Sequence, residues 1–102
     1  MALGSKILLV AGLLTLVACP AEAQTAAPSG AMLGAACVLC HGPDSAGAGA
    51  VPGLKGHNKD YLVVMMKAFR SGERPATVMG RVAKGFSDAE IDAVSAYYAG
   101  LK

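Results

Sequence analysis

The sequence contains no tryptophan, three cysteines and few aromatic residues, which make up 5% of its 102 residues. Three cysteines cannot supply the set of disulfides that often stabilises a small fold. A single domain of this size therefore needs something else to complete its hydrophobic core. The formal net charge of +2 is too small for a typical nucleic-acid-binding protein. No segment alternates apolar and polar residues as a half-buried strand does, which favours an all-α fold.

No apolar run is long enough to cross a membrane. The longest, residues 7–18, follows Lys6 and falls well short of the roughly 20 residues that a transmembrane helix needs. A positive charge before such a short apolar run is typical of a secretory signal peptide. The small residues Ala21 and Ala23 form a cleavage pattern. This pattern predicts a signal peptide over residues 1–23, no transmembrane span and a periplasmic location.

Cys19 offers a second interpretation of the same segment. Leu16 to Cys19 matches the lipobox of bacterial lipoproteins, in which the cysteine carries a lipid anchor. A third interpretation is that Cys19 is discarded with the signal peptide. The sequence leaves cleavage after Ala23 and lipidation of Cys19 both open, and both predict export.

The pattern that carries the most chemistry is Cys37-Val38-Leu39-Cys40-His41, which is the attachment signature of a c-type haem. Two intervening residues place the two thiols about one helical turn apart, where each can form a thioether bond to a haem vinyl group. His41 follows directly and can supply the proximal nitrogen ligand of the iron. One covalently bound haem c would also provide the apolar centre that so short a chain lacks.

Two other kinds of site share part of this motif. A thioredoxin-type redox pair uses C-x-x-C, but it requires a βαβ context that this sequence does not show. Half of a zinc site also uses C-x-x-C, but zinc requires two further ligands, and His57 is the remaining nitrogen donor. Haem attachment is therefore the favoured interpretation.

The sixth position on the iron has five candidate ligands. Met32 lies too close in sequence to the attachment site to reach the opposite face of the haem. Met65 and Met66 lie in an apolar stripe at helical spacing, where methionine usually fills a core. His57 would give a bis-histidine haem, although a loop histidine is more often solvated. Met79 lies in an irregular segment that can fold over the distal face, and we expect it to be the axial ligand.

Helical apolar spacing and capping residues predict three main helices. They cover residues 30–41, residues 59–71, and the stretch from the Ser87 capping box to Gly100. Residues 24–29 are expected to form a flexible leader, and two long loops, residues 42–57 and 72–85, to wrap round the haem. The sequence thus predicts a small all-α fold of three main helices and two long loops around one covalent haem.

The first of these loops contains Pro52 between Val51 and Gly53. We expect this segment to place a backbone carbonyl against Nδ1 of His41, because such a hydrogen bond fixes the imidazole and tunes its basicity. The alternative is that Pro52 merely stiffens a turn.

From Cys37 to Lys102 the sequence resembles the class I c-type cytochromes. The run Met79-Gly-Arg-Val-Ala-Lys-Gly85, with its flanking residues, is similar to the methionine segment of the cytochrome subunit of flavocytochrome c sulfide dehydrogenase and of the cytochrome c4 family. The sequence departs from these families in two ways. It has one haem motif where cytochrome c4 has two, and it has Phe86 where tyrosine is common.

The resemblance implies a cytochrome c domain over residues 30–102. It also implies that Cys37 and Cys40 bind haem covalently and that His41 and Met79 are the axial iron ligands. Because histidine and methionine together saturate the iron, this ligand set predicts an electron carrier and not an enzyme. A haem enzyme or a gas sensor would instead need an open coordination position on the iron.

Two roles remain for an electron carrier. The resemblance implies a haem subunit that accepts electrons from a flavoprotein subunit of a sulfide dehydrogenase. The alternative is a free periplasmic cytochrome c that carries electrons to a terminal oxidase or a reaction centre. In either role the basic residues Arg81 and Lys84, next to the expected ligand loop, are candidates for steering a redox partner.

Overall fold

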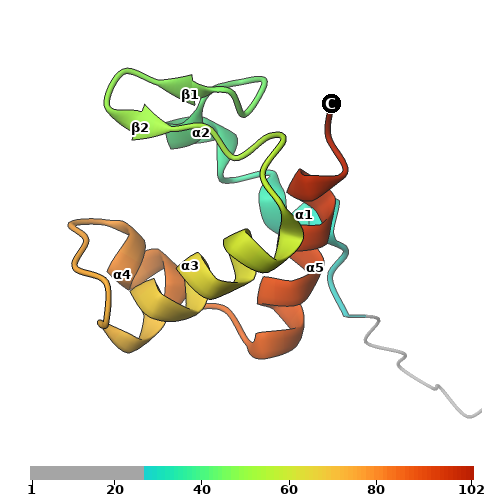
Figure 1. Cartoon of the computed structure of the whole chain (residues 1–102). Coiled ribbons are helices and arrows are strands. Elements are labelled where there is room, and N and C mark those ends of the chain that lie inside the picture. The colour runs from blue at the N-terminus through green and yellow to red at the C-terminus, as the bar shows by residue number, and fades with distance from the viewer. Residues whose placement is uncertain (1–26) are drawn as a thin grey trace, which may run out of the picture.

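The structure is a computed structural model that describes residues 27–102 (Figure 1). Within this range the chain forms five helices and one two-stranded hairpin. In chain order these are α1 (Gly30–Gly34), α2 (Val38–His41), β1 (Gly47–Ala48), β2 (Val51–Pro52), α3 (Lys59–Ser71), α4 (Met79–Ala83) and α5 (Asp88–Ala99). No described helix is long and apolar enough to span a membrane. The expected signal peptide and Cys19 lie outside the described residues.

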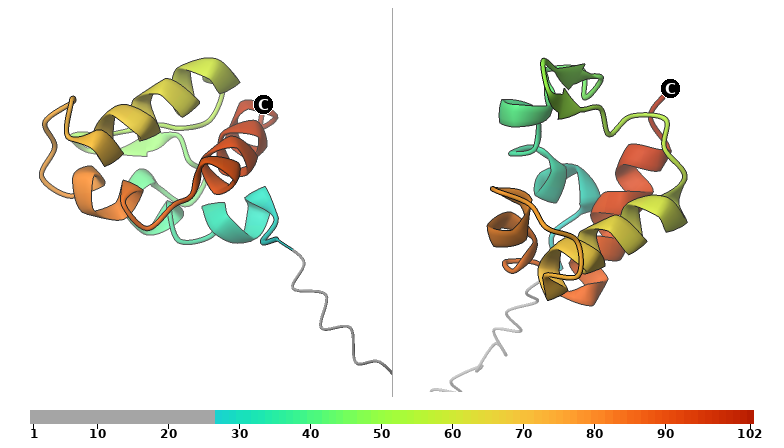
Figure 2. Two further views of the ribbon diagram at one scale, coloured as in Figure 1. Left: turned by 90° about the horizontal axis from the view of Figure 1, so that it is seen from below. Right: turned by 60° about the vertical axis from the view of Figure 1, so that its left-hand side comes forward.

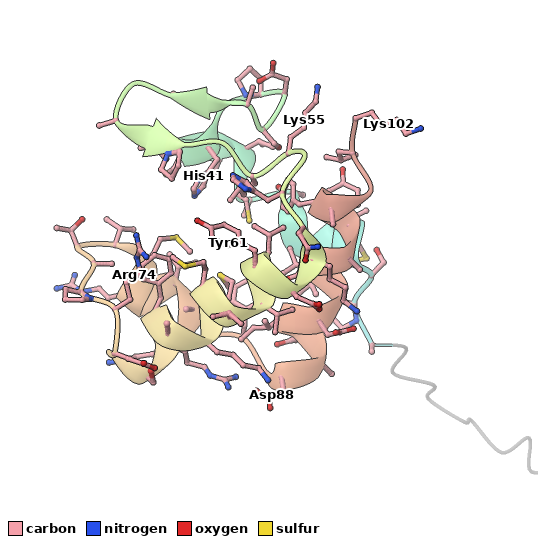
Figure 3. The ribbon with its side chains drawn as sticks, in the orientation of Figure 1. His41, Lys55, Tyr61, Arg74, Asp88 and Lys102 are labelled. Atoms are coloured by element: carbon pink, nitrogen blue, oxygen red, sulfur yellow. The ribbon has the colours of Figure 1, made fainter. Side chains whose placement is uncertain are left out.

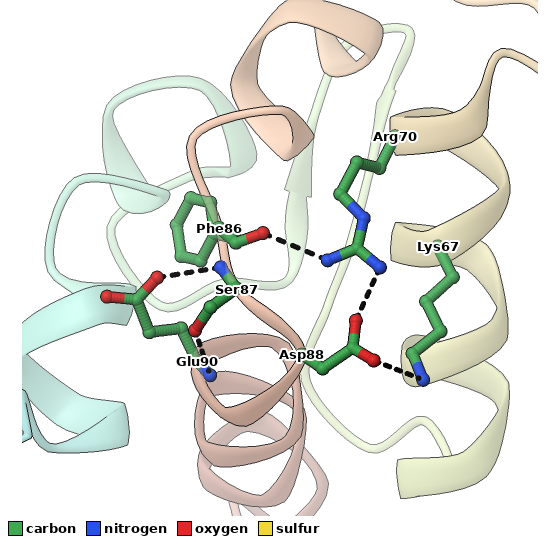
Figure 4. A network of polar contacts seen from close by, with 6 residues as sticks. All are labelled: Lys67, Arg70, Phe86, Ser87, Asp88 and Glu90. Atoms are coloured by element: carbon green, nitrogen blue, oxygen red, sulfur yellow. Dashed lines mark hydrogen bonds and ion pairs between the residues drawn. The ribbon is translucent and has the colours of Figure 1, made fainter.

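Helices α3 and α5 begin where the capping residues predict. Asn58 Oδ1 accepts a hydrogen bond from the Asp60 backbone N–H at 2.7 Å and so caps α3. Ser87 Oγ accepts from the Glu90 N–H at 3.2 Å, and the Glu90 carboxylate accepts from the Ser87 N–H at 2.8 Å. This capping box satisfies two backbone donors at the start of α5, as Figure 4 shows.

Arg70 ties the last turn of α3 to the first turn of α5 (Figure 4). Its guanidinium donates to the Phe86 carbonyl at 3.0 Å and also to the Asp88 carboxylate. Lys67 lies 3.6 Å from the same carboxylate. The hydrogen bond from Arg70 is the main cause that lowers the pKa of Asp88. These contacts hold the segment that contains α4 between two fixed points.

The first predicted helix is interrupted. Residues 30–41 form α1 and α2 with a turn at residues 35–37, and not one continuous helix. The backbone N–H groups of Ala35 and Cys37 donate to the carbonyls three residues earlier, at 3.3 and 3.0 Å. Such i→i−3 bonds wind the chain more tightly than an α-helix does. The prediction of one continuous helix over residues 30–41 is therefore wrong at this turn.

The two predicted loops also contain short regular elements. In the first, Ala48 pairs with Val51 in an antiparallel hairpin whose turn begins at Gly49, with φ of 58°. Favoured two-residue hairpin turns need a positive φ at this position. In the second, Met79 begins the short helix α4, where the sequence predicted an irregular segment. The prediction of an all-α fold holds, with this small hairpin added to it.

The elements surround a central space. Helix α1 packs against α5, and α3 packs against both α4 and α5. Helix α2 and the hairpin lie together on the opposite side from α3 and α4 (Figures 1 and 2). The buried hydrophobic core is small and consists of Leu62, Ala83, Ile91, Val94 and Tyr98. Most side chains that line the space between the two sides are apolar.

Helices α1 and α5 meet through a close contact of backbone and ring. Tyr98, which is 3% exposed, donates a hydrogen bond from its hydroxyl to the Gly34 carbonyl at 2.6 Å. Burial raises the pKa of Tyr98 to about 12, so the hydroxyl keeps its proton throughout the neutral range. This bond fixes α5 against the segment that leads into α2.

Candidate functional site

A cavity of about 210 Å³ lies between the two sides of the molecule. Its wall contains Cys37, Cys40 and His41 from one side and Met79 from the other. All four predicted site residues therefore come together around one space. The rest of the wall is almost entirely apolar. It includes leucine and valine side chains from α3, α4 and α5, and Phe86 from the segment between α4 and α5.

His41 is held in one orientation. Its side chain points from α2 into the middle of the molecule (Figure 3), and the residue is 7% exposed. Nδ1 lies 2.5 Å from the Pro52 carbonyl oxygen. Because a carbonyl only accepts, Nδ1 carries the proton and Nε2 is the nitrogen left to bind a metal. The expectation that this loop places a carbonyl against Nδ1 is confirmed.

The backbone around Gly42 makes this hydrogen bond possible. Gly42 follows His41 directly and has φ of 92°, in the region that favours glycine. A Cβ at this position would lie 2.8 Å from the Gly47 carbonyl oxygen at the start of β1. The sharp turn at Gly42 brings the hairpin back across α2, so that the Pro52 carbonyl meets the imidazole.

The two cysteines of the motif are free thiols in positions suited to a shared ligand. Cys37 is half-buried, whereas Cys40 is exposed. The Cys40 N–H donates to the Cys37 carbonyl at 3.2 Å, so that one helical turn separates the two side chains. Burial raises the pKa of the Cys37 thiol.

The alternative iron ligands have different surroundings. Met32 is 71% exposed. Met65 accepts a hydrogen bond at Sδ from Arg74 at 3.6 Å, and His57 stacks on Tyr61 with 5.0 Å between ring centroids. None of these three lines the cavity. Met66 does line the cavity, together with Met79. Replacing each methionine in turn tests which of the two sulfurs binds the iron.

Sequence reasoning missed one polar residue of the cavity wall. Ser95 is 2% exposed and lines the cavity. Among residues 27–102, its Oγ is the buried side-chain polar atom that has no hydrogen-bond partner. The available signal was its spacing, since Ser95 follows Ile91 by four residues on the inward face of α5.

Comparison with known proteins identifies the family. The profile of the family described as Cytochrome c matches residues 27–102, which is most of the chain. The chain belongs to the cytochrome c family. As a cytochrome c, it carries covalently bound haem c and transfers electrons.

Two relatives of this cytochrome c carry the names of a sulfide dehydrogenase and a thiosulfate dehydrogenase. The cytochrome subunit of sulfide dehydrogenase from Chlorobaculum tepidum is 33% identical over 82 residues, which cover 80% of this chain and 74% of the relative. The thiosulfate dehydrogenase electron acceptor of Stutzerimonas stutzeri is 42% identical over 69 residues, which cover 64% of this chain and 32% of the relative. The resemblance found in the sequence is confirmed.

A solved structure agrees with the fold. Cytochrome c4 from Acidithiobacillus ferrooxidans superposes with a TM-score of 0.63 at 38% identity, over 65% of this chain and 38% of the cytochrome c4 chain. This cytochrome c thus corresponds to a little over a third of that longer protein.

The cavity residues fit a covalent haem c. Two thiols lie one turn apart on one side, next to an imidazole whose Nε2 is free to bind iron. A thioether lies in the opposite wall, and the lining between them is apolar. These are the donors and surroundings that haem c requires. When bound, the haem supplies a centre that gains and loses one electron.

Proposed function

We propose that this protein is an exported monohaem electron carrier in which Cys37 and Cys40 hold the haem, and His41 and Met79 bind its iron. The observation that carries the proposal is the apolar cavity with these four residues in its wall and His41 fixed by Pro52. Histidine and methionine would fill both axial positions, so the site suits electron exchange and not binding of a substrate. Residues 1–23 would direct export and then be removed.

Expression of the full chain with haem-ligation machinery tests this function. The product should be red, and its mass should exceed that of the polypeptide by one haem. The ferric protein should show the sulfur-to-iron charge-transfer band, and the reduced protein should not bind carbon monoxide at neutral pH. A colourless folded product, or rapid carbon monoxide binding by the reduced protein, would contradict the proposal.

We infer that the electron donor is the flavoprotein subunit of a sulfide dehydrogenase. This inference is supported by similarity to the cytochrome subunit of sulfide dehydrogenase from Chlorobaculum tepidum. The match covers 74% of that subunit. The second candidate role, a free periplasmic carrier, is favoured by the single haem motif between Cys37 and His41. Purification from the native host separates the two roles, because a flavin should co-elute with the haem if the chain is a subunit of the complex.

A group of cations lies beside α4 and would face the partner. Arg74, Arg81 and Lys84 line a shallow depression at this end of the molecule. None of the three forms an ion pair within residues 27–102, whereas Lys59, Lys67 and Arg70 do. Unpaired cations attract an acidic surface and increase the rate of encounter with it.

Reversing the charge of this group should slow reactions with anions. The variant with Arg81→Glu and Lys84→Glu should be oxidised about tenfold more slowly by ferricyanide, an anionic electron acceptor, at low ionic strength. The difference should shrink as salt screens the charges. Stopped-flow absorbance measures the rates.

The matched control changes net charge equally at another face. Lys55 and Lys102 lie at the opposite end of the molecule from Arg74 (Figure 3). Replacing Lys55 and Lys102 by glutamate should slow the ferricyanide reaction far less. Equal slowing by both double variants would show that net charge, and not the group beside α4, governs the encounter.

A further inference from the structure

The buried hydroxyl of Ser95 is unexplained by the fold alone. Ser95 lies in the third turn of α5 between Val94 and Ala96 and is 2% exposed. A helical serine can bond the carbonyl four residues earlier, which here belongs to Ile91. Its Oγ makes neither that bond nor any other within the part of the chain that the structure describes.

Such an arrangement is costly without a compensating role. A buried hydroxyl without a partner loses its hydrogen bonds to water, and this loss destabilises the fold. Alanine at this position would keep the helix and avoid that cost. Within residues 27–102 the hydroxyl therefore has no hydrogen-bonding role in α5.

The residue that carries this hydroxyl borders the cavity of the haem site. Ser95 lines it together with His41 and Met79, and most of the remaining wall is apolar. In apolar surroundings the interaction of a dipole with a charge is much stronger than in water. Because the proposed axial ligands, histidine and methionine, are both neutral, oxidation leaves one additional positive charge at the iron and porphyrin.

We propose that Ser95 tunes the reduction potential of the haem by turning its hydroxyl dipole toward it. A hydroxyl with no protein partner is free to rotate and can direct its oxygen toward the positive charge of the oxidised state. The reduced state lacks that charge and gains less. The hydroxyl therefore favours the oxidised state and lowers the reduction potential. This inference rests on the proposed function, since it requires haem iron with His41 and Met79 as ligands.

The test is a redox titration of the haem-loaded protein and its Ser95 variants. Ser95→Ala should shift the equilibrium with a redox mediator about threefold toward the reduced protein, which corresponds to roughly 30 mV. Ser95→Val should shift it in the same direction, because valine also lacks a hydroxyl. Ser95→Thr should stay near the wild-type potential, because threonine keeps the hydroxyl. Threonine also has nearly the shape of valine. The Thr and Val pair thus separates the hydroxyl from the added volume.

Ser71→Ala is the control for removal of a hydroxyl elsewhere. Ser71 is exposed at the end of α3, and its Oγ donates to the Ala68 carbonyl at 3.2 Å. Its loss should leave the potential unchanged. An unchanged or lower potential in Ser95→Ala, or equal shifts in the Thr and Val variants, would overturn the role of Ser95. A wild-type protein without the sulfur-to-iron band would instead overturn the proposed function, so the two failures can be told apart.

Discussion

Replacing Met79 by leucine should give a protein whose reduced form binds carbon monoxide. Leucine has nearly the volume of methionine but no sulfur, so the change removes the proposed iron ligand with little effect on packing. The thioether favours the reduced state, and its loss should therefore lower the reduction potential, by an amount on the order of 0.1 V within the range that axial ligands span. The sulfur-to-iron band of the ferric spectrum should disappear.

Met66→Leu is the matched control, because Met66 lines the same cavity from α3. This variant should keep the charge-transfer band and continue to exclude carbon monoxide. Its stability should change by less than about 1.5 kcal/mol, as expected for a swap of similar volume. If Met66→Leu loses the band and Met79→Leu keeps it, the ligand comes from α3 and the assignment of Met79 is wrong.

Replacing Gly30 by alanine should strongly destabilise the fold. A Cβ at Gly30 would lie 2.2 Å from the Ala93 carbonyl oxygen and 2.9 Å from Cβ of Tyr97. Both are fixed parts of α5, so α1 must move away from α5 to make room. We expect a loss of about 3 kcal/mol in the free energy of unfolding, which lowers the thermal midpoint by roughly 10–20 °C. Thermal unfolding followed by circular dichroism measures this loss.

Gly100→Ala tests whether the loss comes from the helix contact or from glycine replacement in general. Gly100 has φ of −82°, and a Cβ there would meet its nearest neighbours at 3.5 Å, which is ordinary contact. Its replacement should change stability by less than about 1 kcal/mol. A Gly30→Ala variant as stable as Gly100→Ala would mean that α1 and α5 do not pack as closely as the structure has them.

Elements with local capping signals could be predicted from the sequence, and elements without them could not. Asn58 and the Ser87 capping box act within a few residues of their own helices, so their effect is visible in sequence. The β1–β2 hairpin has two residues in each strand, too few to show any periodicity. Helix α4 begins at Met79, and its N-cap residue Val78 makes no side-chain cap. Contacts with α3 must therefore position this helix.

The candidate site shows the same division. The motif from Cys37 to His41 and the Pro52 carbonyl could be predicted because they involve one short stretch of chain and the turn after it. The approach of Met79 from the other wall depends on how α3 and α4 pack, and its role as ligand stays a prediction. Ser95 could not be singled out, because a serine on a helix is visible in sequence but its lack of a partner is not.

The hydrogen bond from Tyr98 to Gly34 joins residues 64 positions apart. This hydrogen bond between α1 and α5 therefore closes a ring that contains most of the described chain. The entropic cost of closing such a ring grows only with the logarithm of its length. Each doubling of the length adds about 0.6 kcal/mol to this free-energy cost. Additional residues inserted in the surface segment between Gly72 and Val78 would thus hardly weaken the contact between Tyr98 and Gly34. The architecture can acquire new surface loops, and with them new docking preferences, without rebuilding its centre.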